Sequence, residues 1–393
     1  MKKYAAPSLL LMICLVAFPQ ISETIYTPSL PDISAALGVS NRSVQLTLSI
    51  YFIGFALGVF CWGWFSDCIG RRPAMLGGLI VYGIGSVMCV NSESISLLLI
   101  SRFIQAFGAA TGSIITQTIL RESVSGNKRH AMFAQISAVI SFTPAVGPLI
   151  GGWVDQALGF RAVFFTLVIM SILLFMYAFL KLPETTDVSS RKRVTILPII
   201  KRMLLSPRVL VFGLLIGGIN GILFSYYAEA PFMFIDHFHI SPGVYGFLGI
   251  IVAVASIVGA MISKRLLTVY VPEKIIHTGC LVMAMGALLL TFASSLVNLP
   301  DLIVIVCILI TMFIMLMGAG IALPHCLSLA LVSFHDVVGT AGAIFSLGYY
   351  LLVSLTTWGM STLHNGSLVT MPIYFLVISG GMWLLGKKFI VKE

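Results

Sequence analysis

The chain has 393 residues, of which 59% are hydrophobic and only 9% are charged, and its formal net charge is +9. A soluble protein would carry about a quarter of its residues as Asp, Glu, Lys or Arg. The composition therefore excludes a soluble protein and indicates one that lies mostly within a membrane.

Apolar runs recur along the whole sequence, and each is long enough to cross about 30 Å of hydrocarbon as a helix. They are continuously apolar, unlike the alternating strands of a membrane barrel. We place twelve spans, at residues 6–27, 43–65, 74–91, 95–119, 131–153, 161–181, 208–229, 242–263, 275–296, 302–322, 338–360 and 369–387. The predicted fold class is therefore all-α integral membrane, with twelve transmembrane helices.

The first span begins like a secretory signal peptide, with Lys2 and Lys3 ahead of an apolar run. The run continues through Phe18 without a small-residue cleavage site, and further spans follow it. We therefore expect an uncleaved first helix.

Lysine and arginine residues gather on one side of this topology. With the N-terminus in the cytoplasm, all but three of the 23 fall on the cytoplasmic side. Arg42 and Arg161 fall on the outer side, and Arg102 falls inside a span. Both termini are therefore expected in the cytoplasm, and the net charge reflects topology and anionic lipid headgroups. We expect the lipid bilayer as a partner and no nucleic acid.

A charged run joins the second and third spans. It carries an acid, two arginines and two glycines, namely Gly63, Asp67, Gly70, Arg71 and Arg72. The run resembles the conserved loop between helices 2 and 3 of the major facilitator superfamily, with Phe65 and Cys68 at positions where the family has leucine and a basic residue. The resemblance implies a gating latch, in which Asp67 pairs with an arginine or caps a helix when the cytoplasmic side is closed.

Span four carries Arg102 about 10 Å into the bilayer, judged from the helical rise. A charge at this depth should face the protein interior or water, and the alternative is an arginine that snorkels outward as an anchor. Gln105, Ala109 and Thr116 fall on the same helical face. The segment resembles the motif R-x-x-Q-G-x-G of the superfamily's antiporters, with Ala106 in place of one glycine.

Span five resembles a second antiporter motif, g-x-x-x-G-P-x-x-G-G, with Thr143 in place of the leading glycine. The residues that carry the resemblance are Pro144, Gly147, Pro148, Gly151 and Gly152. Proline bends a helix and glycine lets a neighbour approach closely. The resemblance implies an exporter, and the alternative is that these residues serve packing alone.

The end of span one resembles the segment D-M-Y-L-P of the drug:proton antiporters in the bicyclomycin and chloramphenicol resistance (Bcr/CflA) branch, and still more the EmrD subgroup. The family's acid aligns with Thr24, and this chain has Glu23 one place earlier. Glu23 is the only acid that we place well inside a span, at nearly the depth of Arg102. We therefore expect the two to couple by contact or through water, with Glu23 as proton carrier. The alternative is an acid in outward-facing water that attracts cations.

The longest hydrophilic stretch lies at the midpoint, at residues 183–207, and we expect it to be a cytoplasmic linker. It would join two pseudo-symmetric six-helix halves, residues 1–182 and 208–393, with the substrate site between them. The candidate cavity residues are Gln20, Tyr26, Tyr51, Phe55, Gln105, Tyr226, Phe345 and Tyr349.

These features predict a proton-coupled antiporter that exports small amphipathic compounds or drugs across a bacterial inner membrane by alternating access. The alternative within transport is a dedicated exporter or importer of a nucleoside, an amino acid or a siderophore-like compound. A receptor or an intramembrane enzyme would need a signalling domain or a catalytic pair, and the sequence offers neither. We expect a monomer without metal or cofactor, whose partners are its substrate and protons.

Overall fold

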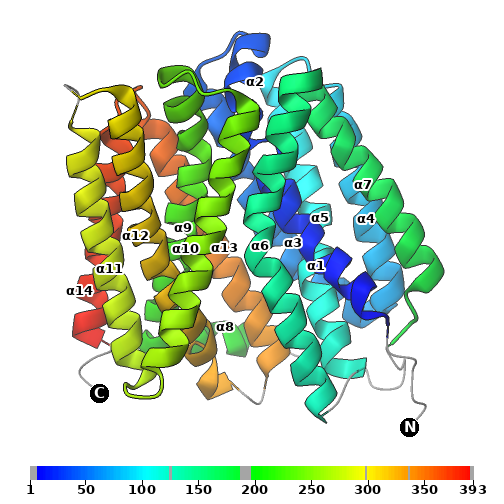
Figure 1. Cartoon of the computed structure of the whole chain (residues 1–393). Coiled ribbons are helices and arrows are strands. Elements are labelled where there is room, and N and C mark those ends of the chain that lie inside the picture. Colours follow the sequence, from blue (N-terminus) through cyan, green and yellow to red (C-terminus); the bar gives the residue numbers. More distant parts are fainter. Residues whose placement is uncertain (1–6, 124–125, 186–195, 297–298, 335–336, 390–393) are drawn as a thin grey trace.

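The computed structural model describes residues 7–123, 126–185, 196–296, 299–334 and 337–389. These residues are almost entirely helical, and the long helices run side by side in one bundle (Figure 1). Ten helical segments among them are long and apolar enough to cross a membrane. The predicted all-α membrane fold class is therefore confirmed, and the chain is a multi-pass membrane protein.

Each predicted span coincides with a helix. The long helices are α1 (Leu9–Thr24), α3 (Asn41–Ile69), α4 (Arg71–Val90), α5 (Ile95–Ser123), α6 (Gly126–Leu158), α7 (Phe160–Lys181), α9 (Pro207–Pro231), α10 (Pro242–Leu266), α11 (Pro272–Ser294), α12 (Asp301–Leu329), α13 (Val338–Leu363) and α14 (Thr370–Phe389). The short elements are η1 (Thr27–Ser29), α2 (Leu30–Leu37), α8 (Ile196–Leu204), η3 (Phe232–His237) and η4 (Val332–Phe334). The helix α8 lies within the predicted linker.

The bundle has two ends, which we name by the chain. α1 begins and α14 ends at the terminal end, where α8 also lies, whereas α2 lies at the far end (Figure 1). Serines at Ser40, Ser206 and Ser241 cap helix starts by accepting a hydrogen bond from a backbone N–H three residues on. These caps satisfy donors that a helix start otherwise leaves free.

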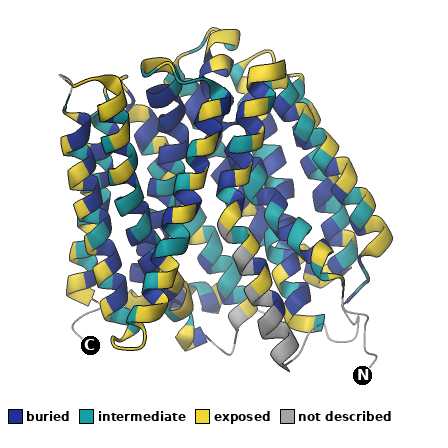
Figure 2. Cartoon of the chain, viewed as in Figure 1, coloured by how far each residue is buried: buried dark blue, intermediate teal, exposed yellow. Residues whose placement is uncertain are grey.

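Helices from the first and second parts of the chain meet along two seams. One seam is formed by α6 and α10, and the other by α3 and α13. Within the first part, α5 packs on both α3 and α4, and within the second part α12 packs on α10 and α11. Figure 2 shows buried residues along the middle of the bundle and exposed ones on its outer faces. The exposed faces are rich in leucine, isoleucine and phenylalanine, as contact with lipid requires.

The loop predicted between the second and third spans is shorter than expected. α3 continues through Ile69 and α4 starts at Arg71, so the turn consists of Gly70 alone. Gly70 has φ +105°, a conformation that side chains disfavour. The predicted boundaries were wrong here because hydropathy marks where apolar residues end, whereas a helix can continue through polar ones.

Candidate functional site

Arg102 lies at the centre of the first part of the bundle and is fully buried. Its guanidinium carbon lies 3.9 Å from the centroid of the Tyr26 ring and 4.3 Å from that of Tyr51. Nη1 donates to the backbone oxygen of Ser22 at 3.4 Å and to Oε1 of Gln105. Arg102 therefore faces the interior, as expected, and two aromatic faces take the place of water around its charge.

The side chains around Arg102 are themselves held in place. The Tyr26 hydroxyl lies 3.0 Å from Oγ1 of Thr47, and Gln105 Nε2 donates to Oγ of Ser86 at 2.8 Å. These contacts bring together α1, α3, α4 and α5 around one cation. Nε and Nη2 of Arg102 nevertheless have no hydrogen-bond partner among the described residues. The guanidinium therefore keeps donors that an additional acceptor could use.

Glu23 lies in the last turn of α1, next to the residue whose carbonyl accepts from Arg102. It is 5% exposed. Within the described part of the chain it forms no ion pair, so the direct contact with Arg102 that we considered is absent in this conformation. The structure thus places a buried acid without an ionic partner near a buried arginine with unused donors.

The latch run forms an ionic cluster at the terminal end. Arg71 Nη1 lies 2.5 Å from Oδ1 of Asp67, so the expected acid–arginine pair is present. The same guanidinium donates through Nη2 and Nε to the two carboxylate oxygens of Glu122, at 2.7 and 3.2 Å. Nη1 also donates to Oγ of Ser66 at 2.6 Å. The cluster therefore joins α3, α4 and α5, and sequence reasoning missed Glu122.

A second missed acid, Glu184, caps the start of α4. Its carboxylate accepts from the backbone N–H of Arg71 at 3.0 Å and of Arg72 at 3.2 Å. A side chain at Gly70 would come within 2.6 Å of this carboxylate, and Arg72 donates to the Phe179 carbonyl at 2.7 Å. An acid at a helix N-terminus complements the helix dipole. The latch is thus anchored to the last turn of α7 and to the segment that follows it.

We expect Asp67→Asn to leave expression and thermal stability near those of wild type and to cut transport sharply. The Asp67 side chain is 66% exposed, and such pairs contribute only about 0 to 1 kcal/mol to stability. Arg71 keeps Glu122 in this variant, so the change acts on the conformational balance. Transport in membrane vesicles and melting of the purified protein measure the two effects. Asp301→Asn, which neutralises an exposed acid at the start of α12, is the control. Full transport by Asp67→Asn would show that the pair has no gating role.

Predicted span five corresponds to α6, whose glycines allow it to pack closely against both α1 and α10. A methyl group at Gly147 would overlap the Thr24 side chain, and one at Gly151 would overlap the Ile25 carbonyl. On another face, a methyl group at Gly152 would overlap the Pro242 carbonyl in α10. The glycines therefore allow backbone contact on both sides of the helix.

The backbone carbonyls of the two prolines in this motif also contact the second part of the chain, Pro144 at α9 and Pro148 at α10. The carbonyl of Pro144 accepts a hydrogen bond from the Tyr227 hydroxyl at 3.0 Å. A methyl group at Gly246 in α10 would come within 2.6 Å of the Pro148 carbonyl. α6 therefore forms a close seam between the two parts of the chain, consistent with a role in their relative movement.

We expect Gly152→Ala to loosen the far end of this seam and to favour a conformation open at that end. The added methyl group would force the backbones of α6 and α10 apart. Maleimide labelling of a cysteine at Thr357, fully buried in α13, reports opening. Gly213→Ala is the control, because its methyl group would make an ordinary contact at 3.5 Å. Equal labelling of both variants would contradict the expectation.

Most of the candidate cavity residues belong to one continuous set of side-chain contacts. Tyr26, Tyr51 and Gln105 surround Arg102, as described above. Gln20 is half-buried in α1. Phe345 and Tyr349 contact each other in α13, with ring centroids 5.7 Å apart. Tyr51 stacks on Phe55 with ring centroids 6.2 Å apart, and Tyr350 lies between Phe55, at 4.8 Å, and Tyr349, at 4.4 Å. These rings of α3 and α13 therefore form one continuous aromatic surface.

Aromatic residues do bridge the two parts of the chain, and several were missed. Phe52 of α3 lies 4.4 Å from Phe224 of α9, between ring centroids, and the predicted Phe55 lies 4.8 Å from Tyr350 of α13. The predicted Tyr226 is buried beside Tyr227, at 5.6 Å. Helical spacing was the available signal, because the Phe52 and Phe55 positions share one face of α3.

Another acid is buried within a helix, contrary to the expectation that Glu23 was alone. Glu229 is 5% exposed, in the last turn of α9, and hydrogen-bonds to Gln45 and His364. The predicted span ended at this residue, whereas the helix continues to Pro231 and then as η3. Sequence reasoning therefore treated Glu229 as the edge of a span.

Comparison with known proteins agrees with this architecture. The model of the Major Facilitator Superfamily matches residues 12–386. An uncharacterized transporter of Rickettsia bellii is 32% identical, over 94% of this chain and 93% of its own length. Multidrug resistance protein D of Escherichia coli is 27% identical, over 88% of each chain. The predicted resemblance to the drug-antiporter branch is therefore confirmed.

The fold also matches a solved structure, that of a D-xylose-proton symporter. The two agree with a TM-score of 0.76 over 97% of each chain, at 16% sequence identity. At this identity the likeness concerns the fold alone. The family match and the fold make the chain a transporter and not an enzyme. The chain belongs to the major facilitator superfamily.

Proposed function

We propose that this chain is a proton-coupled antiporter that exports small amphipathic compounds by alternating access. Residues 1–182 and 208–393 would act as the moving halves, with residues 183–207 as their linker. The observation that carries the proposal is the placement of Glu23, buried without an ion pair, near the unused donors of Arg102. A carboxyl group in such a place can release its proton to water and then pair, as a carboxylate, with the arginine.

In this mechanism the protonated Glu23 is neutral and tolerates burial without an ionic partner. When it loses its proton, the carboxylate gains from the free Nε and Nη2 of Arg102, and α1 moves relative to α5. Because Gly147 and Gly151 of α6 touch the end of α1, this movement is passed to the seam with α10. Binding of substrate and binding of the proton to Glu23 would thus favour different conformations of the first half, so that each weakens the other.

The aromatic contacts between Phe52, Phe55, Phe224 and Tyr350 offer a surface for the substrate when the halves separate. Aromatic rings bind the apolar parts of amphipathic molecules, and they attract cationic ones through their faces. Relatives named for drug resistance support this class of substrate. The second candidate function, a dedicated metabolite transporter, is kept because the 32% identical relative has no named substrate.

We place the protein in a bacterial inner membrane with the terminal end in the cytoplasm. The distribution of lysine and arginine supports this orientation. The far end of the seam between α3 and α13 would then face the outside of the cell. The protein would work as a monomer in the bilayer, with its substrate and protons as partners.

Purified protein in proteoliposomes tests the proposal. An imposed proton gradient should drive accumulation of an amphipathic cation such as ethidium. In the reverse experiment, an imposed ethidium gradient should drive protons across the membrane in the opposite direction to ethidium. A panel of amino acids, nucleosides and siderophore-like compounds is run in parallel. Accumulation of one metabolite and of no amphipathic compound would establish the second candidate function. Transport that ignores the proton gradient would overturn the antiport.

A further inference from the structure

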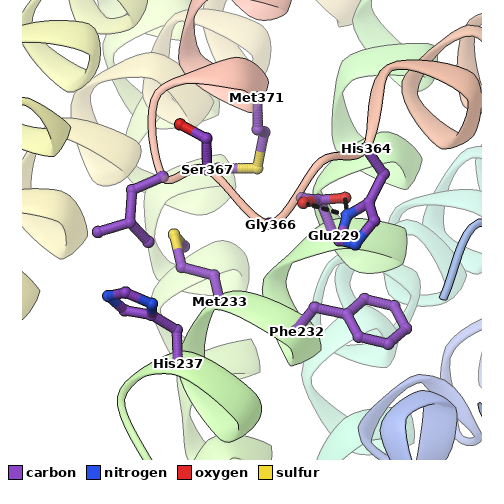
Figure 3. A pocket seen from close by; sticks show the side chains of 9 residues that line it. Glu229, Phe232, Met233, His237, His364, Gly366, Ser367 and Met371 are labelled. Carbon is purple, nitrogen blue, oxygen red and sulfur yellow. Dashed lines mark hydrogen bonds and ion pairs between the residues drawn. The ribbon is translucent and has the colours of Figure 1, made fainter.

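A polar cluster joins the two halves at the far end. Oε1 and Oε2 of Glu229 lie 2.8 and 2.9 Å from Nδ1 of His364, which follows the end of α13 (Figure 3). Gln45 of α3 donates through Nε2 to Glu229 Oε2 at 2.7 Å. Gln45 is fully buried, and the other two residues are less than one-tenth exposed. One carboxylate is therefore shared between an imidazole of its own half and an amide of the opposite half.

Further hydrogen bonds hold the same seam closed. Arg42 Nε donates to the His364 carbonyl at 2.7 Å, and the Ser361 hydroxyl donates to the Arg42 carbonyl at 2.7 Å. About two turns deeper in α13, the Ser354 hydroxyl donates to the Ser49 carbonyl at 2.8 Å. These bonds join α3 to α13 and the residues after it. All of them would break if α3 and α13 separated at this end, and we call this set of contacts the far-end gate.

The imidazole of His364 has one ring nitrogen, Nε2, that is available to bind a proton. Nδ1 faces the Glu229 carboxylate and therefore carries a hydrogen. Nε2 has no hydrogen-bond partner among the described residues, and it is not one of the fully buried unpartnered atoms. Beside the ring lies a small pocket lined by Phe232, Met233 and His237, among others (Figure 3). A proton can therefore reach Nε2 while the bond between Nδ1 and Glu229 stays intact.

Other charged groups surround the pair. Arg42 comes from α3, as described, and the η3 segment brings Asp236 and His237 close to the pocket. Asp236 interacts electrostatically with His364, His239 and Asp32. The neighbourhood therefore holds acids and a further imidazole at the pocket edge, and any test must separate His364 from His237.

We propose that His364 and Glu229 form a proton-binding site open to the far compartment, and that the bound proton stabilises the closed far-end gate. A proton from water adds to Nε2 and gives an imidazolium, whose Nδ1–H then donates to the carboxylate with both partners charged. The neutral imidazole already donates to a charged acceptor, and the added positive charge turns this bond into an ion pair whose Coulomb attraction is strong at a buried site. The added proton fixes Glu229 in the position where Gln45 of the opposite half reaches it.

This role fits the direction of the transport cycle. A carrier that has released its substrate at the far end would take up a proton there and close that end. The inference rests on the alternating access of the proposed function but not on antiport. Its readout is the accessibility of one residue, which can be measured without any substrate. A failure of proton-coupled export and a failure of this gate would therefore be seen in different experiments.

The test follows opening of the far end as external pH changes. A cysteine at Thr357 lies on the α13 face that carries Ser354 and Ser361, and maleimide labelling at this site is quantified by mass spectrometry. Imidazole ordinarily exchanges its proton between about pH 5 and 8. Because maleimide reacts with the thiolate, whose fraction itself falls as the pH is lowered, each rate is divided by that of the exposed native Cys68. We expect this ratio to be about tenfold lower at about pH 5.5 than at about pH 8. Cys68 lies at the terminal end, away from the far-end seam, and slow labelling of the native Cys280, buried in α11, shows that each variant is folded.

His364→Gln and His237→Gln form the matched pair. Loss of the pH dependence in His364→Gln, with retention in His237→Gln, would support the proposal. Glu229→Gln should also lose it, because the imidazolium then has no carboxylate to hold. Retention in His364→Gln would overturn the proposal, and so would loss in both histidine variants, since the effect would then belong to the pocket in general.

Discussion

Replacing Arg102 by alanine is expected to abolish accumulation of substrate against a gradient, with a loss of about a hundredfold or more. Each cation–π contact with a desolvated ring is worth about 2 kcal/mol, and a hundredfold change corresponds to about 2.7 kcal/mol. The change also leaves Gln105 Oε1 and the Ser22 carbonyl without their donor. Energised vesicles loaded with ethidium measure the effect on transport.

Arg102→Lys separates charge from shape. A lysine keeps the positive charge, but it lacks the planar group that lies between Tyr26 and Tyr51 and cannot donate in the same fork geometry. We expect a small residual activity for Arg102→Lys and none for Arg102→Ala. Thermal melting of both variants distinguishes a folding defect from a coupling defect. If Arg102→Ala still accumulates substrate and melts like wild type, Arg102 is not part of the coupling machinery.

The helices of this protein could be predicted from the sequence for a simple physical reason. A backbone in hydrocarbon must satisfy its own hydrogen bonds, so long apolar runs can only be helices. The interior position of Arg102 followed from the same argument, because its charge cannot face lipid. The glycine positions of α6 were recognised by resemblance, and the structure gives their reason, which is backbone contact with Ile25 and Pro242.

The contacts that depend on tertiary structure were not predictable in this way. Glu229 and His364 are 135 residues apart, and Gln45 and His364 are 319 apart. Nothing in the spacing of these residues indicates that they meet. Glu229 was also hidden by its place at a span boundary, since hydropathy declines wherever a charge appears. Glu184 was similarly hidden at the edge of the linker, where it caps α4.

Substituting glutamine for Glu23 is expected to remove the release of protons that substrate causes. Glutamine copies the shape of the protonated acid but has no proton to lose at ordinary pH. The buried side chain should therefore fit its site, and binding of substrate should persist within a few-fold of wild type. Because the variant is fixed in the state that resembles protonated Glu23, downhill exchange of substrate should continue while accumulation against a gradient stops.

The measurement uses detergent-purified protein in weak buffer with a pH-sensitive dye, to which substrate is added. Glu229→Gln is the comparison variant, because Glu229 is also 5% exposed and lies within a helix of the second half. Its carboxylate is already held by Gln45 and His364, whereas Glu23 has no ion pair. We therefore expect proton release to fall strongly in Glu23→Gln and to be at least partly retained in Glu229→Gln, because Glu23 and the His364–Glu229 site bind their protons separately. Release by Glu23→Gln that equals wild type would remove Glu23 from the mechanism, and loss in Glu229→Gln alone would transfer the role of proton carrier to the second half.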